Sequence, residues 1–346
     1  MPLVIEKERW GAIHRKSASI VRIKANTGKK MEVGLTDYGA RIVSVKTPDR
    51  HGTLSEICLG HETLAGYRMS DPQYGCTTGR VANRIANGEF RLDGRVVTLA
   101  RNEKGKHHLH GGVEGFARKL WEILDITETG DAVSVTFRYE SPHGEEHYPG
   151  TLRTTVVYTV TGDSIEIDYN AITDQPTLVN LTNHAYWNLA GANATVHDLD
   201  LVIAASRYAS SDDDSLPTGE LLPVNGTSFD FRKQRTLREP LETLAMIDHS
   251  FVLDKGAAMG FAARLHSAGT GRELTVETDQ PGIHLYTGNS LEGATAWGKP
   301  CVRHQALCLE AQKFPDAPHH DNFPSIVLRP GETYRHTTRH VFGTRE

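Results

Sequence analysis

The sequence lacks the features that would place the protein in several specialised classes. It contains no uninterrupted apolar run of about 18 residues, so no segment is expected to span a membrane. Its 43 acidic and 38 basic residues are interspersed, and no basic stripe indicates binding to nucleic acid. The first residues show neither the basic start nor the apolar stretch of a signal peptide. A cytoplasmic protein is therefore expected.

Cysteine is scarce, and so is any sign of modular construction. The four cysteines, which form no Cys-x-x-Cys pair, are Cys58, Cys76, Cys301 and Cys308. In a chain of 346 residues they indicate reduced, buried thiols rather than a disulfide framework. Because internal repeats, low-complexity tracts and Pro- or Ser-rich linkers are missing, residues 1–346 are expected to form one domain.

Alternation of apolar and polar residues is what the sequence has in abundance. It is clearest over residues 133–140 and 165–171, and a period of two is typical of half-buried antiparallel strands. Turn signals separate such runs, and Asp93-Gly94 predicts a two-residue hairpin. Helical periodicity is confined to residues 62–67 and 238–244. These patterns predict a mainly β protein, a large antiparallel β-sandwich.

The most chemically distinctive segment covers residues 181–191. It places His184 among asparagines and aromatic residues, Tyr186 and Trp187 included. Imidazole can exchange a proton near neutral pH, and amides beside aromatic faces suit a polyhydroxylated ligand. The alternative is a strand whose histidine and aromatic rings pack in the core.

A second polar segment covers residues 79–88, where arginines and asparagines stand between glycines. Arg84 offers a planar fork of donors and Asn83 an amide, both suited to an oxygen-rich ligand. The glycine spacing matches neither a dinucleotide-binding nor a Walker motif, so nucleotide binding is disfavoured. A purely structural turn remains the alternative.

Histidines cluster at positions 107–110. On a strand, His108 and His110 would point to the same face, a familiar arrangement of zinc ligands, and His184 or Asp248 could supply a third ligand. The other interpretations are a ligand-binding His110 and a structural one.

Two carboxylates stand in largely apolar surroundings. Asp248 follows Ile247, and because burying an unpaired carboxylate is costly, it must have partners: a structural network or ligand hydroxyls. Glu310 ends an apolar run and suits a general base, although a salt bridge would also explain it. A glutamate and a histidine brought together would make an acid–base pair.

Taken together, these motifs resemble the aldose 1-epimerase (galactose mutarotase) family. The resemblance runs in the family's order from about residue 35 to the C-terminus. Its matching segments are residues 79–85, 109–112, 181–189, 216–220, 229–231, 247–249, 286–289, 309–312, 323–325 and 328–332.

The resemblance implies a galactose mutarotase-like β-sandwich that interconverts the α and β anomers of free aldohexoses such as galactose and glucose. It implies no cofactor and no metal. Glu310 matches the general base that takes the proton of the anomeric hydroxyl, and His184 matches the acid that protonates the ring oxygen. His110 matches the second active-site histidine, which is expected to stabilise charge near that oxygen.

The resemblance also implies substrate-binding residues. Positions that hold sugar hydroxyls are matched by Asn83, Arg84, Tyr186 and Asp248. His284 stands where a sugar-contacting glutamine is usual, which leaves the preferred sugar open. Further departures from the usual residues are His107, Ala117 and His319. The expected partner is a small sugar, with no nucleic acid or membrane, and the expected assembly is a monomer or homodimer.

Two other functions compete with this interpretation. A glycoside hydrolase would use Glu310 and Asp248 as paired carboxylates flanking a glycosidic bond. A non-catalytic sugar-binding protein on the same scaffold would keep Asn83, Arg84 and Tyr186 but would not need the acid–base pair.

Overall fold

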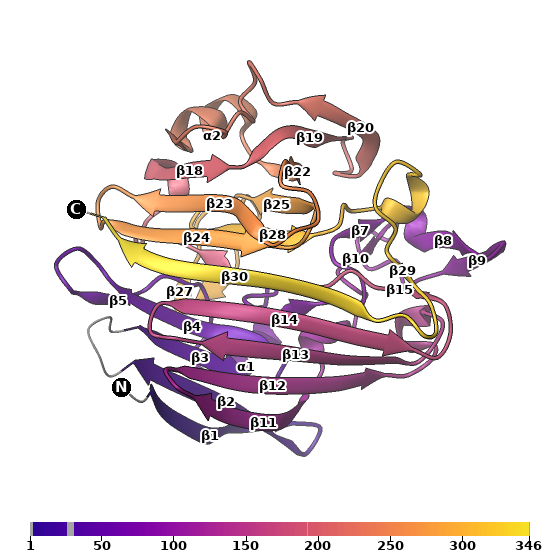
Figure 1. The fold of residues 1–346 in the computed structure, drawn as a ribbon, viewed down its shortest axis with the longest axis horizontal. Helices are drawn as coiled ribbons and strands as arrows, with labels where there is room; N and C mark the ends of the chain where they lie inside the picture. Colours follow the sequence, from indigo (N-terminus) through magenta and orange to yellow (C-terminus); the bar gives the residue numbers. More distant parts are fainter. Residues whose placement is uncertain (1–2, 26–30, 192, 346) are drawn as a thin grey trace.

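The largest sheet of the computed structural model runs across the whole molecule (Figure 1). The structure describes residues 3–25, 31–191 and 193–345. Neighbouring strands of this nine-stranded sheet are antiparallel. In spatial order they are β11 (Glu122–Thr129), β12 (Ala132–Ser141), β13 (Leu152–Val160), β14 (Ser164–Thr173), β30 (Tyr334–Thr344), β24 (Arg272–Thr278), β23 (Gly260–Ser267), β18 (Leu199–Ile203) and β21 (Arg235–Thr236).

Two further antiparallel sheets complete the sandwich. The six-stranded sheet is ordered β17 (Tyr186–Trp187), β28 (Leu307–Gln312), β25 (Gly282–Tyr286), β22 (Asp248–Leu253), β19 (Ala205–Ser211) and β20 (Pro217–Pro223). The five-stranded sheet is ordered β1 (Leu3–Ile13), β2 (Lys16–Ala25), β3 (Glu32–Thr36), β4 (Arg41–Pro48) and β5 (Leu54–Glu56).

Short elements fill the loops between these sheets. The two-stranded pairs are β6 (Thr77–Thr78) with β16 (Thr182–Asn183), β7 (Arg84–Ile85) with β10 (His108–Leu109), β8 (Glu89–Leu92) with β9 (Arg95–Thr98), β15 (Thr177–Leu178) with β29 (Val327–Leu328), and β26 (Thr295–Ala296) with β27 (Lys299–Pro300). The α-helices are α1 (Leu64–Met69) and α2 (Arg238–Leu244), and single 3₁₀ turns occur at Ala86–Gly88, Phe116–Arg118, Glu145–His147, Val196–Asp198 and Ala317–His319.

The three sheets share one apolar core. Its largest cluster joins Val135 and Ile167 of the nine-stranded sheet, Leu285 and Leu309 of the six-stranded sheet and Ile42 of the five-stranded sheet. Each strand contributes alternate residues, as the burial of β13 and β14 illustrates. The predicted antiparallel β-sandwich is therefore confirmed.

The predicted hairpin, the two short helices and the buried cysteines are found in the structure. The hairpin around Asp93-Gly94 is formed by β8 and β9. The two weakly helical stretches correspond to α1, which Thr63 caps, and to α2. All four cysteines are free and buried, as predicted.

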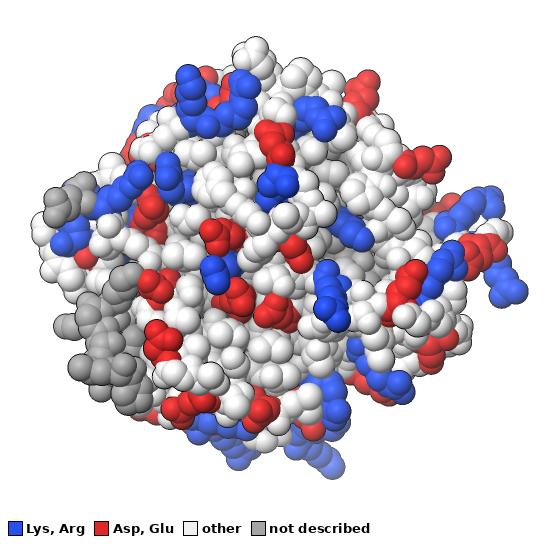
Figure 2. Space-filling model, viewed as in Figure 1, with Lys and Arg blue, Asp and Glu red and all other residues white. Residues whose placement is uncertain are grey.

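Within the described residues, neither helix is long and apolar enough to cross a bilayer. Charges of both signs mix over the face seen in Figure 2, which fits the interspersed acidic and basic residues of the sequence.

A buried histidine gives the core a dependence on pH. His340 of β30 packs against Trp187, and burial lowers its pKa to about 4. This pKa lies below the value of about 6.5 in an unfolded chain. The contribution of neutral His340 to the free energy of unfolding is therefore fully present above pH 6.5 and is lost as the pH falls toward 4. The loss attributable to this residue is on the order of 3 kcal/mol.

Replacing His340 with Leu should remove this contribution. Guanidinium unfolding at about pH 7 and pH 4 should show a free energy of unfolding that falls less in the variant, by about 3 kcal/mol. An equal fall in both proteins would mean that His340 does not titrate in this way.

Candidate active site

The sequence-predicted site residues converge on one cavity of about 450 Å³. Ligand pockets typically range from about 300 to 1,000 Å³, so a monosaccharide can be enclosed. All the predicted residues line it: Asn83, Arg84, His110, His184, Tyr186, Asp248, His284 and Glu310.

The cavity lies over the face of the six-stranded sheet that points away from the largest core cluster, here called the outer face. On β28, Leu307 and Leu309 belong to the core cluster, whereas Glu310 lines the cavity. On β25 the core residue Leu285 likewise lies beside the cavity residue His284. The strict alternation of a strand is therefore what separates core from site.

Strand register brings together residues far apart in the sequence. His284 pairs with Glu310 across β25 and β28, and Asp248 pairs with Tyr286 across β22 and β25. Tyr186 of β17 pairs with Cys308 of β28. Directly opposed residues in antiparallel strands have neighbouring side chains, so these pairings place the polar groups in one patch.

His184 and Glu310 form a candidate acid–base pair. The His184 Nε2 atom lies 3.5 Å from Glu310 Oε1, and the residues are only 5% and 1% exposed. The backbone around His184 is anchored, since its N–H donates to the Cys76 carbonyl and its carbonyl accepts from Gly75. The second oxygen of Glu310 is buried without a hydrogen-bond partner in the described structure. Such an oxygen is costly to bury, and a ligand hydroxyl would satisfy it.

His110 is held as a neutral donor. The Asn83 backbone N–H donates to its Nδ1 atom at 3.2 Å, so the proton of the neutral ring must lie on Nε2. Burial, followed by the charges of His184 and Arg84, holds the pKa of His110 well below its usual range. The ring can therefore donate a hydrogen bond to a ligand oxygen at neutral pH.

A glycine shapes the loop that carries this histidine. His110 itself has a left-handed φ of 50°, and Gly111 follows at 82°. A Cβ atom on Gly111 would collide with the carbonyl oxygen of Gly79. Glycine is therefore required here because the backbone of Gly79 approaches closely.

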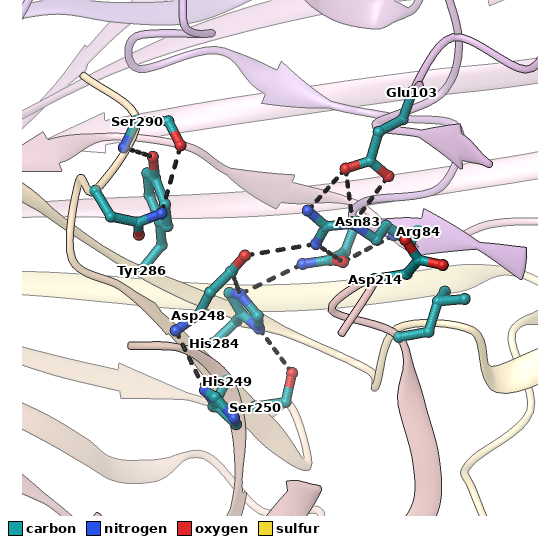
Figure 3. A network of polar contacts seen from close by, with 12 residues as sticks. Asn83, Arg84, Glu103, Asp214, Asp248, His249, Ser250, His284, Tyr286 and Ser290 are labelled. Atoms are coloured by element: carbon teal, nitrogen blue, oxygen red, sulfur yellow. Dashed lines mark hydrogen bonds and ion pairs between the residues drawn. The ribbon is translucent and has the colours of Figure 1, made fainter. Parts of the chain in front are cut away.

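The opposite wall is a charged network centred on Asp248 (Figure 3). Its Oδ1 atom lies 2.7 Å from His284 Nε2, and its Oδ2 atom lies 3.6 Å from Arg84 Nη1. Arg84 also holds Glu103 through two nitrogens: Nε lies 3.0 and 2.9 Å from its two carboxylate oxygens, and Nη2 lies 2.9 Å from Oε1. The predicted need of Asp248 for partners is thus confirmed.

These partners keep Asp248 ionised. Burial favours its neutral form, but the hydrogen bond from His284 and the charges of His284 and Arg84 outweigh burial. They hold the pKa of this carboxyl well below its usual range. Asp248 is therefore an acceptor for hydroxyl groups over the physiological pH range.

In the same network, Ser250, His284 and Asp248 form a row of hydrogen-bonded side chains. The Ser250 hydroxyl lies 2.8 Å from His284 Nδ1, on the far side of the ring from Asp248. Ser250 is buried and does not line the cavity, whereas Asp248 does. This row of side chains is thus oriented to hold the Asp248 carboxylate at the cavity rather than to activate Ser250 as a nucleophile.

Tyr186 and Trp187 point to opposite sides of the sheet. Tyr186 lines the cavity, donates its hydroxyl to the Pro72 carbonyl at 3.0 Å and packs beside the His184 ring. Trp187 is fully buried against His340 and Phe342.

The prediction that His108 and His110 share one face is wrong. The strand β10 ends at Leu109, and the left-handed backbone of His110 breaks the alternation. His108 is instead buried, with Nδ1 on the Ala100 carbonyl and Nε2 beside the Tyr148 hydroxyl. With both nitrogens engaged, His108 is not available as a metal ligand.

Within the described chain, one group of side chains offers metal-ligand atoms close together: His184, Cys308 and Glu310. The thiol lies against Nδ1 of the histidine and the carboxylate lies against Nε2. The imidazole ring therefore stands between the other two groups, which suits orientation of the ring better than convergence on one ion.

The other sequence departures lie away from the cavity. His107 accepts from the Asn87 N–H, and His319 contacts Asp316 at 2.6 Å. Ala117 is buried at a 3₁₀ turn. Only His284 among the four departures lines the cavity in the described structure.

Sequence reasoning missed several cavity residues. Glu103 and Lys104 come from a loop without a recognisable pattern, and Tyr286 belongs to a motif whose tyrosine was not singled out. Behind the cavity lining lies Cys308, which was expected only to be a buried thiol, yet its sulfur contacts His184. The alternation of β28 places it on the same face as Glu310 and could have identified it.

The β-sandwich thus carries a polar cavity with a buried histidine–glutamate pair, an arrangement suited to acid–base chemistry. The chain belongs to the aldose 1-epimerase family, whose sequence model matches residues 21–340. It is accordingly an isomerase of the mutarotase type.

Individual relatives agree with this assignment. Galactose mutarotase of Homo sapiens is 42% identical over 313 residues, which cover 89% of this chain and 90% of that protein. Aldose 1-epimerase of Escherichia coli (strain K12) is 36% identical over 334 residues, or 93% of this chain and 94% of that protein. The crystal structure of an aldose epimerase homologue from C. elegans is 32% identical, with a TM-score of 0.85 over 91% of this chain and 96% of that one.

Proposed function

We propose that the protein interconverts the α and β anomers of free aldohexoses such as galactose and glucose, with Glu310 as the base and His184 as the acid. The observation that carries this proposal is the buried His184–Glu310 pair, 3.5 Å apart, with a carboxylate oxygen left for a ligand hydroxyl.

The reaction needs proton transfers between oxygens only. Glu310 takes the proton of the anomeric hydroxyl while His184 protonates the ring oxygen, and the bond between C1 and the ring oxygen breaks. The open aldehyde turns about the C1–C2 bond. On reclosure His184 recovers its proton from the ring-closing hydroxyl, and Glu310 returns its proton to the new anomeric oxygen. Each positioned acid or base typically contributes ~10²–10⁴-fold.

The remaining residues orient the sugar. Asp248 accepts hydrogen bonds from hydroxyl groups, Asn83 and His284 line the same wall, and His110 donates toward the oxygen on which charge develops. Orientation of this kind lowers the barrier by restricting the ring before reaction.

The charges of the cavity favour a neutral sugar. Among its described lining residues the permanent cations are Arg84 and Lys104. Arg84 is already engaged by Glu103 and Asp248, and Lys104 is largely exposed at the rim. A sugar phosphate would therefore meet carboxylates without a free cation to balance it.

The direct test follows freshly dissolved α-galactose and α-glucose by polarimetry or NMR. The protein should accelerate the approach to anomeric equilibrium, and a chelator should leave the rate unchanged. An unaltered rate for both sugars at high protein concentration would refute the proposal.

A glycosidase would need Asp248 or Glu310 as an acid, and the network argues against Asp248 in that role. A general acid must hold a proton, whereas the pKa of Asp248 is held below its usual range. Release of sugar from an aryl glycoside by the protein would contradict this argument and favour a glycosidase.

Replacing Ser250 with Ala should weaken substrate binding more than turnover. The substitution removes the 2.8 Å partner of His284 Nδ1, so the ring that fixes Asp248 is less constrained. We expect KM for galactose to rise about three- to tenfold and kcat to change little. Ser267→Ala, a buried serine of β23, is the matched control. A fall in kcat alone would contradict a binding role for this network.

A further inference from the structure

The ring of His184 lies between two groups of the same strand. Its Nε2 atom is 3.5 Å from Glu310 Oε1, and its Nδ1 atom is 3.5 Å from the Cys308 sulfur. Cys308 and Glu310 are two residues apart on β28 and share its outer face. The thiol is the polar partner of Nδ1 in the described structure.

We propose that Cys308 is a positioning residue for the epimerase reaction, whose thiol sets the orientation and tautomer of His184 so that Nε2 carries a proton into the cavity. This inference rests on the proposed role of His184 as the acid.

Packing alone cannot fix whether Nε2 or a ring carbon faces Glu310. The His110 and Tyr186 rings each lie with centroids 5.1 Å from that of His184, so they confine the plane of its ring. A half-turn of the imidazole exchanges nitrogen and carbon positions but leaves the shape of the ring almost unchanged. A hydrogen bond to one nitrogen is what distinguishes the two orientations.

The chemistry of a thiol fits this task. His184 can act as the acid only from its charged form, because a neutral ring that gave up its Nε2 proton would become an imidazolate. Once the charged ring has given up that proton, the remaining proton lies on Nδ1, where the sulfur can accept it. In a neutral resting ring the thiol can instead donate to Nδ1, which keeps the proton on Nε2. It can also accept from Nδ1–H when the ring is charged, so one neighbour serves both protonation states.

The surroundings keep Cys308 a thiol. It is fully buried (0% exposed), and burial, followed by the charge of Glu310, raises its pKa well above the usual range. A thiolate is therefore disfavoured, and the side chain acts as a neutral hydrogen-bonding group rather than as a nucleophile.

The test compares Cys308→Ala and Cys308→Ser with Cys58→Ala. Cys58 is an equally buried thiol (1% exposed) whose sulfur contacts the Leu59 carbonyl instead of His184. Cys308→Ala should lower kcat for galactose by about three- to tenfold at nearly constant KM, the effect of losing a neutral hydrogen bond. Cys308→Ser should recover most of this loss because a hydroxyl also donates and accepts. Cys58→Ala should retain the kcat of the wild type.

A spectroscopic readout separates positioning from general damage to the fold. With ¹⁵N-labelled histidine, the ring nitrogens of His184 should report an Nε2–H tautomer in the wild-type protein and in Cys308→Ser. Cys308→Ala should show a mixture of tautomers. An unchanged kcat and an unchanged tautomer in Cys308→Ala would overturn the inference.

The same experiments distinguish this inference from the proposed function. A wild-type protein that does not accelerate mutarotation would refute the proposed function, whatever the tautomer of His184. An active wild type whose His184 carries its proton on Nδ1 would leave the proposed function standing and overturn the role of Cys308.

Discussion

Replacing Glu310 with Gln is expected to lower kcat for galactose and glucose by roughly 10²–10⁴-fold. The amide keeps the shape of the side chain but cannot accept the proton of the anomeric hydroxyl. Because Glu310 lies within the fully buried strand β28, whose backbone holds it on both sides, the change should leave the cavity intact. Polarimetry gives the rate, and calorimetric titration with galactose should show affinity within a few-fold of the wild type.

Glu145→Gln provides the matched control for this substitution. Glu145 is also a largely buried carboxylate, bonded to the Tyr139 and Ser141 hydroxyls, but it does not line the cavity. Its replacement should leave kcat unchanged even if stability falls. A fully active Glu310→Gln protein would show that another group is the base.

Replacing His184 with Gln is expected to have an effect of similar size, again roughly 10²–10⁴-fold on kcat. The glutamine amide can donate a hydrogen bond near the position of Nε2, but it cannot release a proton to the ring oxygen. The loss should therefore appear in kcat, while KM changes much less.

The double variant tests whether the two residues act as a unit. If Glu310 and His184 transfer protons in the same step, the double variant should be scarcely slower than the slower single variant. Fully additive losses would indicate independent roles. His340→Leu, a buried histidine of the core, is the control and should keep the activity of the wild type.

The sequence pattern predicted the fold because alternation acts over short distances. Residues 133–140 and 165–171 alternate in the sequence, and β12 and β14 do so in the structure. The pattern could not predict that the β17, β28, β25 and β22 strands share one sheet, since pairing between distant strands leaves no local signal. The convergence of His184, Asp248 and Glu310 therefore came from the family resemblance and not from periodicity.

Backbone geometry explains the main error. The spacing of His108 and His110 predicts a common face only if the strand continues through both residues. The strand β10 instead ends at Leu109, and His110 adopts a left-handed conformation. A single residue in the left-handed conformation cannot be recognised from side-chain alternation. This change of backbone direction is why the His108 and His110 rings lie in different environments.

The polar contacts of Glu103 and of the predicted site residue His284 escaped prediction because they join loops and strands. Glu103 becomes part of the site through its bidentate contact with Arg84. His284 gains its role from Asp248 on one side and Ser250 on the other. Neither contact can be derived from spacing along the chain.

The alternation of β28 and β25 has a consequence for how this protein can change. Site residues 284, 286, 308 and 310 occupy even positions, while core residues 283, 285, 307 and 309 occupy odd ones. Point substitutions on the cavity side can therefore alter sugar preference without touching the largest core cluster. An insertion or deletion of one residue within these strands would exchange the two sets and place charge in the sandwich. Evolution and engineering of the sugar preference should thus proceed by substitution in the strands, with changes of length confined to the loops at the rim.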